Sequence, residues 1–320
     1  MKAVVYEQYG EPSVLKVAEV AKPVIQANEV LIAVKASGVN PVDTYFRKGI
    51  RTVDSFPHIP HFDLAGEVVE IGSSVTGVAV GDRVWATGAK GASAEFAAVS
   101  HELVFPLPET IPFTDGAALA MPFMTAHLSL YYRGALQANQ SVLIFGAAGA
   151  VGHAAVQLAK QTGAHVIATA GDDEKAKLAK EAGADDVIMY KQEDLVERAK
   201  ELTAQKGVDL ILDMSLSENI EKDLEMIAIG GRIVTVGSPV NNTPTLPWRL
   251  LNAKNASLQG ILLLTAPTEE MKQAGQEIAE KFAAGSLQAH VGKVLPFSEP
   301  ATAHELVEQK QINGRIILSH

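Results

Sequence analysis

The chain has 320 residues, 47% of them apolar and 20% charged, which supplies enough core material for two domains of ordinary size. Its net charge of −10 argues against nucleic acid or an acidic membrane as the main partner, and it requires a local positive site for any anionic ligand. The chain has no cysteine, so we expect neither disulfides nor thiolate chemistry. It has no apolar run long enough to span a bilayer, and its N-terminus soon turns polar, so we expect neither membrane insertion nor secretion. The cytoplasm is the expected compartment.

Short strands separated by turns dominate the N-terminal third of the chain. They are predicted at residues 2–6, 29–34 and 67–72, with Gly and Pro between them. This pattern favours an antiparallel, barrel-like β domain. The domain is expected to end near residues 120–125, where a Met-Pro-Phe segment leads into a helix.

The most informative stretch spans residues 141–160. A buried strand at 142–145 breaks into a turn of Gly and Ala, and a segment with helical spacing follows from Gly152. Such a strand, turn and helix bind a dinucleotide pyrophosphate, because backbone N–H groups approach the phosphates and the helix N-terminus is partly positive. The spacing Ala147-x-Gly149-x-x-Gly152 departs from the commoner Gly-x-Gly-x-x-Gly, and taken alone such a turn can also serve close packing.

Strands and helices alternate after this turn. Apolar, β-branched runs occur at residues 165–169, 186–189, 208–212 and 232–236, and a charged helix is expected at 173–181. This alternation predicts a doubly wound parallel sheet, and in that context the glycine turn is interpreted as a dinucleotide site.

The end of the second strand of this sheet indicates which dinucleotide is bound. An NAD site usually carries Asp or Glu about 20 residues past the turn, to hold the ribose 2′-hydroxyl. That position falls on Ala170, which leaves room for a 2′-phosphate, and Lys175 follows with a positive charge. We therefore predict NADPH, although Asp172 and Asp173 weaken an anion site and Lys175 can also be a solvated helix lysine.

The pattern changes again after about residue 264. Helices are expected at 268–284 and 300–309, and strands at 293–297 and 315–318. These elements can return to the N-terminal domain and make it discontinuous. The predicted domains are a catalytic domain formed by residues 1–124 with 265–320, and a cofactor domain formed by 125–264.

Ordered segments along nearly the whole chain resemble the zinc-free members of the medium-chain dehydrogenase/reductase superfamily, closest to the quinone oxidoreductase and ζ-crystallin group. The resemblance implies a GroES-like β-barrel catalytic domain beside a Rossmann domain. In relatives, the strand corresponding to residues 257–264 pairs with its copy, so the resemblance also implies a homodimer. The matching segments are 36–45, 63–68, 81–84, 121–126, the glycine turn, 169–171, 183–185, 230–232 and 236–238.

The same resemblance predicts that no metal is bound. The superfamily's alcohol dehydrogenases hold zinc with a Cys and a His at the positions of Asn40 and Phe62, neither of which can serve. His58 and His61 are three residues apart but are interpreted as surface or pocket-rim histidines. His61 stands where relatives often have glycine.

The resemblance also implies a set of site residues. Asn40 and Tyr45 line the nicotinamide cleft in relatives and are the candidate catalytic donors toward a substrate oxygen, with Tyr45 alternatively a packing residue. Arg51 stands near a position where several relatives carry tyrosine, which can favour an anionic substrate or be a solvated loop residue. The implied cofactor contacts are Asn40, Thr125, Ala148, Gly149, Ala150, Val151, Gly171, Lys175, Tyr190, Ser215, Asn219, Gly237, Ser238, Ile261, Leu262 and Leu263.

These observations predict an NADPH-dependent oxidoreductase that reduces quinones by hydride or electron transfer without a metal. Two alternatives stay open. One is an enoyl or enone reductase, which needs a proton donor such as Tyr45 or His61. The other is an NADPH-binding protein with little turnover. The physiological acceptor and the choice between one- and two-electron transfer are not determined by the sequence.

Overall fold

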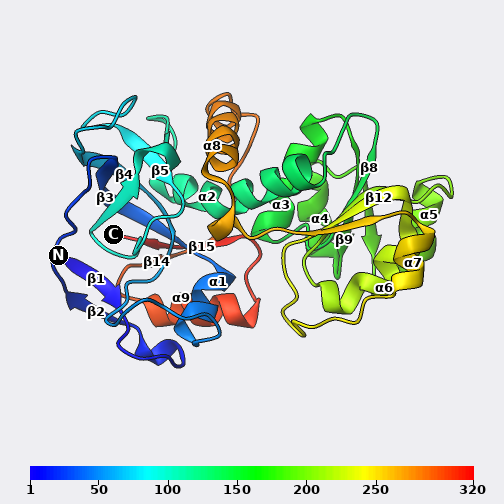
Figure 1. The fold of residues 1–320 in the computed structure, drawn as a ribbon, viewed down its shortest axis with the longest axis horizontal. Coiled ribbons are helices and arrows are strands. Elements are labelled where there is room, and N and C mark those ends of the chain that lie inside the picture. Colours follow the sequence, from blue (N-terminus) through cyan, green and yellow to red (C-terminus); the bar gives the residue numbers. More distant parts are fainter. The chain divides into compact units, whose positions relative to one another are not determined.

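The computed structural model describes residues 1–320, which form two compact units. One unit comprises Met1–Met121 and Met271–His320, and the other comprises Pro122–Glu270 (Figure 1). The sequence placed these divisions at residues 124 and 264, and the structure places them at Met121 and Glu270. None of the helices combines the length and the apolar character needed to cross a bilayer.

The first unit is built on a seven-stranded, mostly antiparallel sheet with the order β14-β15-β3-β4-β5-β7, in which β6 also pairs with β3. The C-terminal strand β15 lies antiparallel to β3, with Ile317 opposite Gly38, so the end of the chain completes the sheet that its beginning starts. The strands of this sheet are β3 (Glu29–Val39), β4 (Asp63–Ile71), β5 (Arg83–Ala86), β6 (Phe96–Ser100), β7 (Val104–Pro106), β14 (Val291–Pro296) and β15 (Arg315–Ser319), and a separate antiparallel pair is formed by β1 (Lys2–Val5) and β2 (Lys16–Glu19). The helices are α1 (Pro41–Arg47) and α9 (Pro300–Gln309), with short 3-10 turns at Pro12–Val14 and His101–Leu103. The unit boundaries fall within α2 (Phe113–His127) and α8 (Thr268–Ala283).

Alternating apolar side chains give this sheet its core. Val30, Ile32 and Val34 of β3 face Leu64 and Val68 of β4, and all are buried. Burying one such side chain contributes roughly 1.5–3 kcal/mol. The antiparallel β domain predicted from strands and turns, with its GroES-like character, is therefore confirmed.

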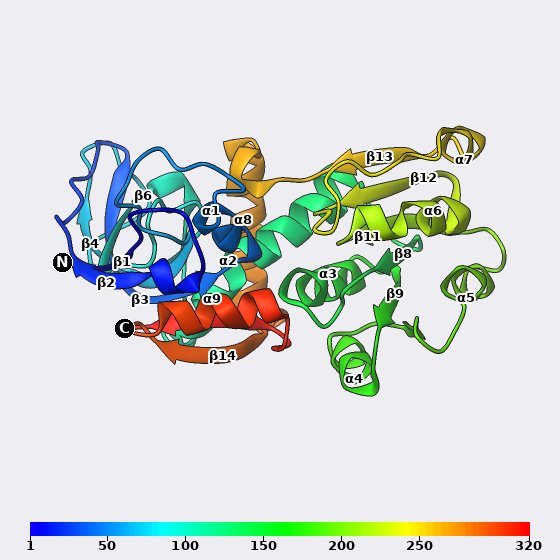
Figure 2. The same ribbon diagram turned by 90° about the horizontal axis from the view of Figure 1, so that it is seen from below.

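The second unit is a six-stranded, fully parallel sheet with the order β10-β9-β8-β11-β12-β13. Helices α3 and α4 cover one face, and α5 and α6 cover the other (Figure 2). The predicted doubly wound Rossmann sheet is confirmed, and the strand order reverses between β8 and β11, where such sheets bind ligands. The strands are β8 (Ser141–Ile144), β9 (His165–Ala170), β10 (Asp186–Met189), β11 (Val208–Asp213), β12 (Ile227–Thr235) and β13 (Ser257–Gly260). The helices are α3 (Ala150–Gln161), α4 (Asp173–Glu181), α5 (Leu195–Leu202), α6 (Leu216–Met226) and α7 (Trp248–Ala253), with a π-helical turn at Leu128–Arg133 and a 3-10 turn at Leu263–Thr265.

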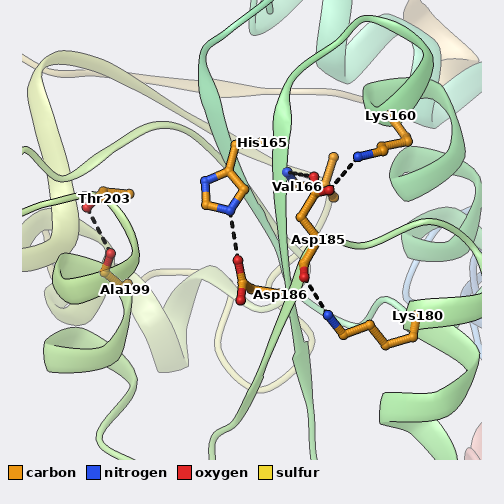
Figure 3. A network of polar contacts seen from close by, with 8 residues as sticks. All are labelled: Lys160, His165, Val166, Lys180, Asp185, Asp186, Ala199 and Thr203. Carbon is orange, nitrogen blue, oxygen red and sulfur yellow. Dashed lines mark hydrogen bonds and ion pairs between the residues drawn. The ribbon is translucent and has the colours of Figure 1, made fainter.

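Polar contacts at the amino ends of β9 and β10 hold the helices of this unit to its sheet (Figure 3). His165 Nε2 lies 2.8 Å from Asp186 Oδ2 on the neighbouring strand. Asp185 accepts the Val166 N–H at 2.9 Å and pairs with Lys160 of α3, and its carbonyl accepts from Lys180 of α4. These contacts lie at the edge opposite the carboxyl ends of the strands, so this network is structural.

Candidate functional site

The turn between β8 and α3 presents free N–H groups at the carboxyl end of the parallel sheet. Gly149 is the N-cap of α3 and provides no side chain to cap the helix. The N–H groups of Ala150, Val151 and Gly152 therefore have no acceptor in the chain, whereas that of His153 already bonds Gly149 O at 2.8 Å. Free N–H groups and the positive end of the helix dipole make this turn a site for an anion such as a pyrophosphate.

The glycines of this turn have different roles. Gly146 adopts a φ of 62°, in the left-handed region that favours glycine, whereas Gly149 has a φ of −83° and a ψ of 166°. Gly149 therefore does not need a positive φ, because the reversal of the chain occurs at Gly146. A Cβ on Gly152 would lie 2.2 Å from Gly146 O, so Gly152 allows close packing of helix and turn. Gly149 is exposed and is free to meet a ligand.

The loops after β11 and β12 are joined to each other beside this turn. Leu216 N–H donates to Gly237 O at 3.0 Å, and Ser217 N–H donates to Ser238 Oγ at 3.2 Å. A Cβ on Gly146 would lie 3.5 Å from Met214 Cγ, so the loop after β11 also reaches the glycine turn. We call these segments, residues 146–152, 214–219 and 236–238, the carboxyl edge. It brings Ala148, Gly149, Ala150, Val151, Ser215, Asn219, Gly237 and Ser238 into one region of the second unit.

Asn219 has a structural partner within this region. Its Nδ2 donates to Asp213 Oδ1 at 2.9 Å, and the Ser215 N–H donates to the same oxygen at 2.7 Å. The side chain of Asn219 thus holds the loop after β11. Asp213 itself is fully buried and was not among the residues predicted from the sequence.

The residues predicted for the adenosine end lie together after β9 and β10. A Cβ on Gly171 would lie 2.7 Å from the Tyr190 hydroxyl oxygen, and the Tyr190 ring is half exposed. Lys175 Nζ forms an ion pair with Asp172 Oδ2 at 2.7 Å, and this hydrogen bond lowers the pKa of Asp172 and raises that of Lys175. The charge predicted to face a 2′-phosphate is therefore neutralised in the structure by a neighbouring carboxylate.

The remaining residues predicted for the second unit lie elsewhere in it. Thr125 is buried in α2, and its carbonyl accepts from Ser129 Oγ at 2.6 Å. Ile261 follows β13, where its N–H donates to Thr235 O at 3.1 Å. Ile261 and Leu263 are buried, and Leu262 is partly exposed, which gives an apolar segment after the edge strand.

Asn40 is the centre of a buried polar network in the first unit. Its Nδ2 donates to Asp63 Oδ2 at 2.9 Å, and its Oδ1 accepts from Arg315. Arg315 also pairs with Asp63, whose other oxygen accepts from Thr87 Oγ1 at 2.8 Å. The Asn40 amide is thus held in one orientation with a single N–H left over. Asp63 and Arg315 were missed as functional candidates from the sequence, where 252 positions separate them.

Helix α1 follows directly from this network. Asn40 N–H donates to Asp43 Oδ2 at 2.6 Å, which caps the first turn. Burial raises the pKa of Asp43 to about 8. Tyr45 is partly buried on the same helix, and its hydroxyl has no hydrogen-bond partner in the chain, while Arg51 beyond the helix is exposed. Asn40, as the N-cap, and Tyr45 are therefore both carried by α1.

The interpretation of His61 as a surface or pocket-rim residue is wrong. His61 is 1% exposed, and its Nε2 lies 3.1 Å from His304 Nε2 of α9, with Ser37 Oγ 3.3 Å from its Nδ1. Burial, His304 and Arg315 lower the pKa of His61, so the ring is neutral. Its φ of 71° explains why glycine suits this position. His58 is partly buried, and its ring packs 5.2 Å from that of Tyr6.

Curated relatives and solved structures match this chain along nearly its whole length. Residues 26–109 match the alcohol dehydrogenase GroES-like domain, and residues 150–280 match the zinc-binding dehydrogenase family. A quinone oxidoreductase of Sus scrofa is 35% identical over 324 residues, covering 99% of this chain and 97% of the relative. The structure of Escherichia coli quinone oxidoreductase complexed with NADPH has a TM-score of 0.90 at 30% identity and covers 100% of both chains. The CurK enoyl reductase structure has a TM-score of 0.90 at 26% identity, covering 99% of this chain and 98% of its own.

Proposed function

The chain belongs to the quinone oxidoreductase group of the medium-chain dehydrogenase/reductase superfamily, and we propose that it reduces quinones with NADPH and without a metal ion. The observation that carries the proposal is the carboxyl edge, where the uncapped N-terminus of α3 meets two loops that are hydrogen-bonded to each other. The NADPH complex of the E. coli relative supports the choice of cofactor.

The residues of the second unit fit NADPH. Ala150, Val151 and Gly152 would donate N–H groups to the pyrophosphate, since none of them has an acceptor in the chain. Tyr190 and Lys175 would hold the adenosine end. When bound, the nicotinamide supplies the hydride. Ser215 and the loop Gly237–Ser238 would orient it, and the apolar segment Ile261–Leu263 would exclude water from it.

In the first unit, we assign the catalytic donors to Asn40 and Tyr45. Negative charge develops on the substrate oxygen as hydride arrives, and fixed donors stabilise that charge best when they need not reorganise. Asn40 meets this requirement because Asp63 and Arg315 fix its amide and leave one N–H for a ligand. The Tyr45 hydroxyl has no hydrogen-bond partner in the chain and can donate to an oxygen.

An enoyl or enone reductase is the second candidate, and the similarity to CurK enoyl reductase favours it. Such a reaction needs a proton for the α-carbon. His61 is unsuited to this role because it is buried, neutral and paired with His304. Tyr45 is then the donor. A protein that binds NADPH with little turnover is the third candidate, and the fixed Asn40 amide, together with an intact glycine turn, argues against it.

The three candidates are separated by following NADPH absorbance with 9,10-phenanthrenequinone, 1,4-benzoquinone, crotonyl-CoA and an alkyl enone. We expect consumption with the quinones. Turnover with only the enone or crotonyl-CoA, lost in Tyr45→Phe, would establish the reductase of carbon–carbon double bonds instead. Binding of NADPH with no acceptor turned over would favour the third candidate.

The proposed independence from metal gives a testable prediction. At the positions of the superfamily's zinc ligands, Phe62 has no ligand atom and the Asn40 amide is committed to Asp63 and Arg315, so these residues do not fit zinc. Prolonged EDTA treatment should leave turnover unchanged, and elemental analysis should find no stoichiometric zinc. Activity lost with EDTA and restored by zinc would refute the prediction.

The ion pair of Lys175 with Asp172 makes cofactor selectivity a second prediction. Lys175→Ala should weaken NADPH about ten-fold and leave NADH almost unchanged, because the lost contact is to the 2′-phosphate. Asp172→Asn should tighten NADPH, since Lys175 no longer has to leave its partner. Fluorescence titration of both cofactors measures this. Lys177→Ala on the same helix, which removes an exposed pair with Glu181, is the matched control. Equal affinity of the native chain for both cofactors would contradict the assignment.

We also propose a homodimer, formed through the free edge of β13. This strand pairs with β12 on one side only, and Val240 and Trp248 nearby are exposed. An unpaired strand edge is normally covered or paired. Sedimentation of the full chain tests the assembly, and a monomer would exclude it.

The cysteine-free composition leaves the cytoplasm as the proposed compartment.

A further inference from the structure

Two aspartates lie beneath the carboxyl edge and have no exposed surface. Asp213 ends β11, and Asp223 lies in α6. Asp213 Oδ1 accepts from the Ser215 N–H and from Asn219 Nδ2. Its Oδ2, and both oxygens of Asp223, receive no N–H or O–H from any other residue. These three buried oxygen atoms can therefore form a hydrogen bond only between the two carboxyls.

The position of Asp223 in its helix is otherwise apolar. Leu216, Ile220 and Leu224 of α6 pack into the core of the second unit. A carboxyl group among such residues costs several kcal/mol if it is ionised and unpaired. An Asp at this position therefore needs a partner, and the carboxyl in contact with it is that of Asp213.

Two adjoining buried carboxyls cannot both be ionised, so they hold a proton between them. Burial raises the pKa of Asp223 well above its ordinary value, and the neighbouring charge of Asp213 raises it further. Several charged groups near Asp223 have other partners: Arg198 and Lys200 of α5 pair with Glu193, Glu201 and Glu197, Lys254 after α7 bonds Ile227 O, and Glu218 accepts from Ser215 Oγ. Glu221, Lys222 and Glu225 of α6 and Arg249 of α7 are exposed.

We propose that the protonated Asp223 carboxyl donates to Asp213 and that this pair positions the loop 214–219 for the cofactor. Asp223 orients Asp213 by binding its Oδ2, and Asp213 then fixes Ser215 and Asn219 through its Oδ1. The loop in turn holds Gly237 and Ser238 through the Leu216 and Ser217 N–H groups. The proposal rests on the proposed function for its cofactor. Asp213 and Asp223 are positioning residues, because both are buried below the ligand-facing atoms.

The shared proton makes the stability of the folded chain depend on pH. The folded chain keeps a proton that the unfolded chain releases near the ordinary pKa of Asp, so the free energy of unfolding falls as pH rises toward the raised pKa. Asp223→Asn removes this dependence and keeps an N–H that donates to Asp213. It therefore imitates the protonated pair at every pH. Asp223→Leu removes the donor entirely.

The experiment uses the full chain and three variants: Asp223→Asn, Asp223→Leu, and Glu221→Gln on the exposed side of α6 as control. Hydrogen exchange followed by mass spectrometry reports on peptides covering residues 213–220 without any cofactor. Fluorescence titration gives the Kd for NADPH, and thermal melts from about pH 6 to about pH 9 give the pH dependence. Each variant is compared with the native chain under identical conditions.

We expect Asp223→Asn to bind NADPH like the native chain near pH 7. As the pH rises, its Tm should fall less than that of the native chain. Asp223→Leu should exchange faster in the loop and bind NADPH about ten-fold more weakly. If the Tm of Asp223→Asn falls with rising pH as steeply as that of the native chain, the shared proton is overturned. This test stands even if Asp223→Leu fails to fold. Unchanged loop exchange in a folded Asp223→Leu would overturn the positioning role. Failure of the native chain to bind NADPH would defeat the proposed function, whereas the exchange and the melts still test the carboxyl pair.

Discussion

Ala150→Leu is expected to abolish NADPH binding while the Tm of the cofactor-free chain hardly changes. Ala150 is the first residue of α3, is partly exposed, and has an N–H that no group in the chain accepts. Because Ala150 is partly exposed, the folded chain should accommodate a leucine there, whereas the longer side chain should occupy the proposed position of the pyrophosphate. Loss of the phosphate contacts should weaken binding at least about 100-fold, which is about 2.7 kcal/mol.

Gly152→Ala is the matched control for this prediction. Its Cβ would lie 2.2 Å from Gly146 O, a contact with rigid backbone, so this variant should lower the Tm as well as the affinity. The pair of variants separates approach of a ligand from packing of helix against turn. Fluorescence titration with NADPH and thermal melts measure both effects. If Ala150→Leu binds NADPH normally, the pyrophosphate does not lie on this turn and the dinucleotide interpretation fails.

The parallel sheet was predictable because its strands are buried on both faces. Such strands form apolar runs, as residues 142–145 do without interruption and residues 208–212 do apart from Asp209, and glycines mark their ends. Strand β12 starts at Ile227, whereas the sequence predicted 232. Gly230 has a φ of 77° and lies within β12, where the register against β11 shifts.

The buried polar contacts were not predictable from the same patterns. His61 and His304 are 243 residues apart, and their pairing depends on where α9 packs in the folded unit. An isolated charge such as Asp63 or Asp223 usually lies on the surface, so composition and spacing favour exposure. Only the topology, which pairs β15 with β3 and places α6 against β11, brings each buried group to its partner.

Arg315→Met should destabilise the first unit more than any surface substitution. Arg315 and Asp63 are 3% and 0% exposed, and Arg315 also holds the Asn40 amide. Removing one partner of a buried ion pair leaves the other charge uncompensated, which costs about 3–5 kcal/mol. Urea unfolding should show this loss. Lys177→Met, which removes an exposed pair, should cost about 1 kcal/mol at most.

The double variant Asp63→Asn with Arg315→Met decides whether charge or packing causes the loss. With both charges removed, no buried ion lacks a counter-charge, so most of the stability should return. Turnover should stay low in the double variant, because Arg315 no longer donates to the Asn40 Oδ1 and the amide loses its fixed orientation. Recovery of stability without recovery of kcat therefore identifies Asp63 and Arg315 together as the residues that orient Asn40. An Arg315→Met chain within about 0.5 kcal/mol of the native chain would show that this pair contributes nothing to the fold.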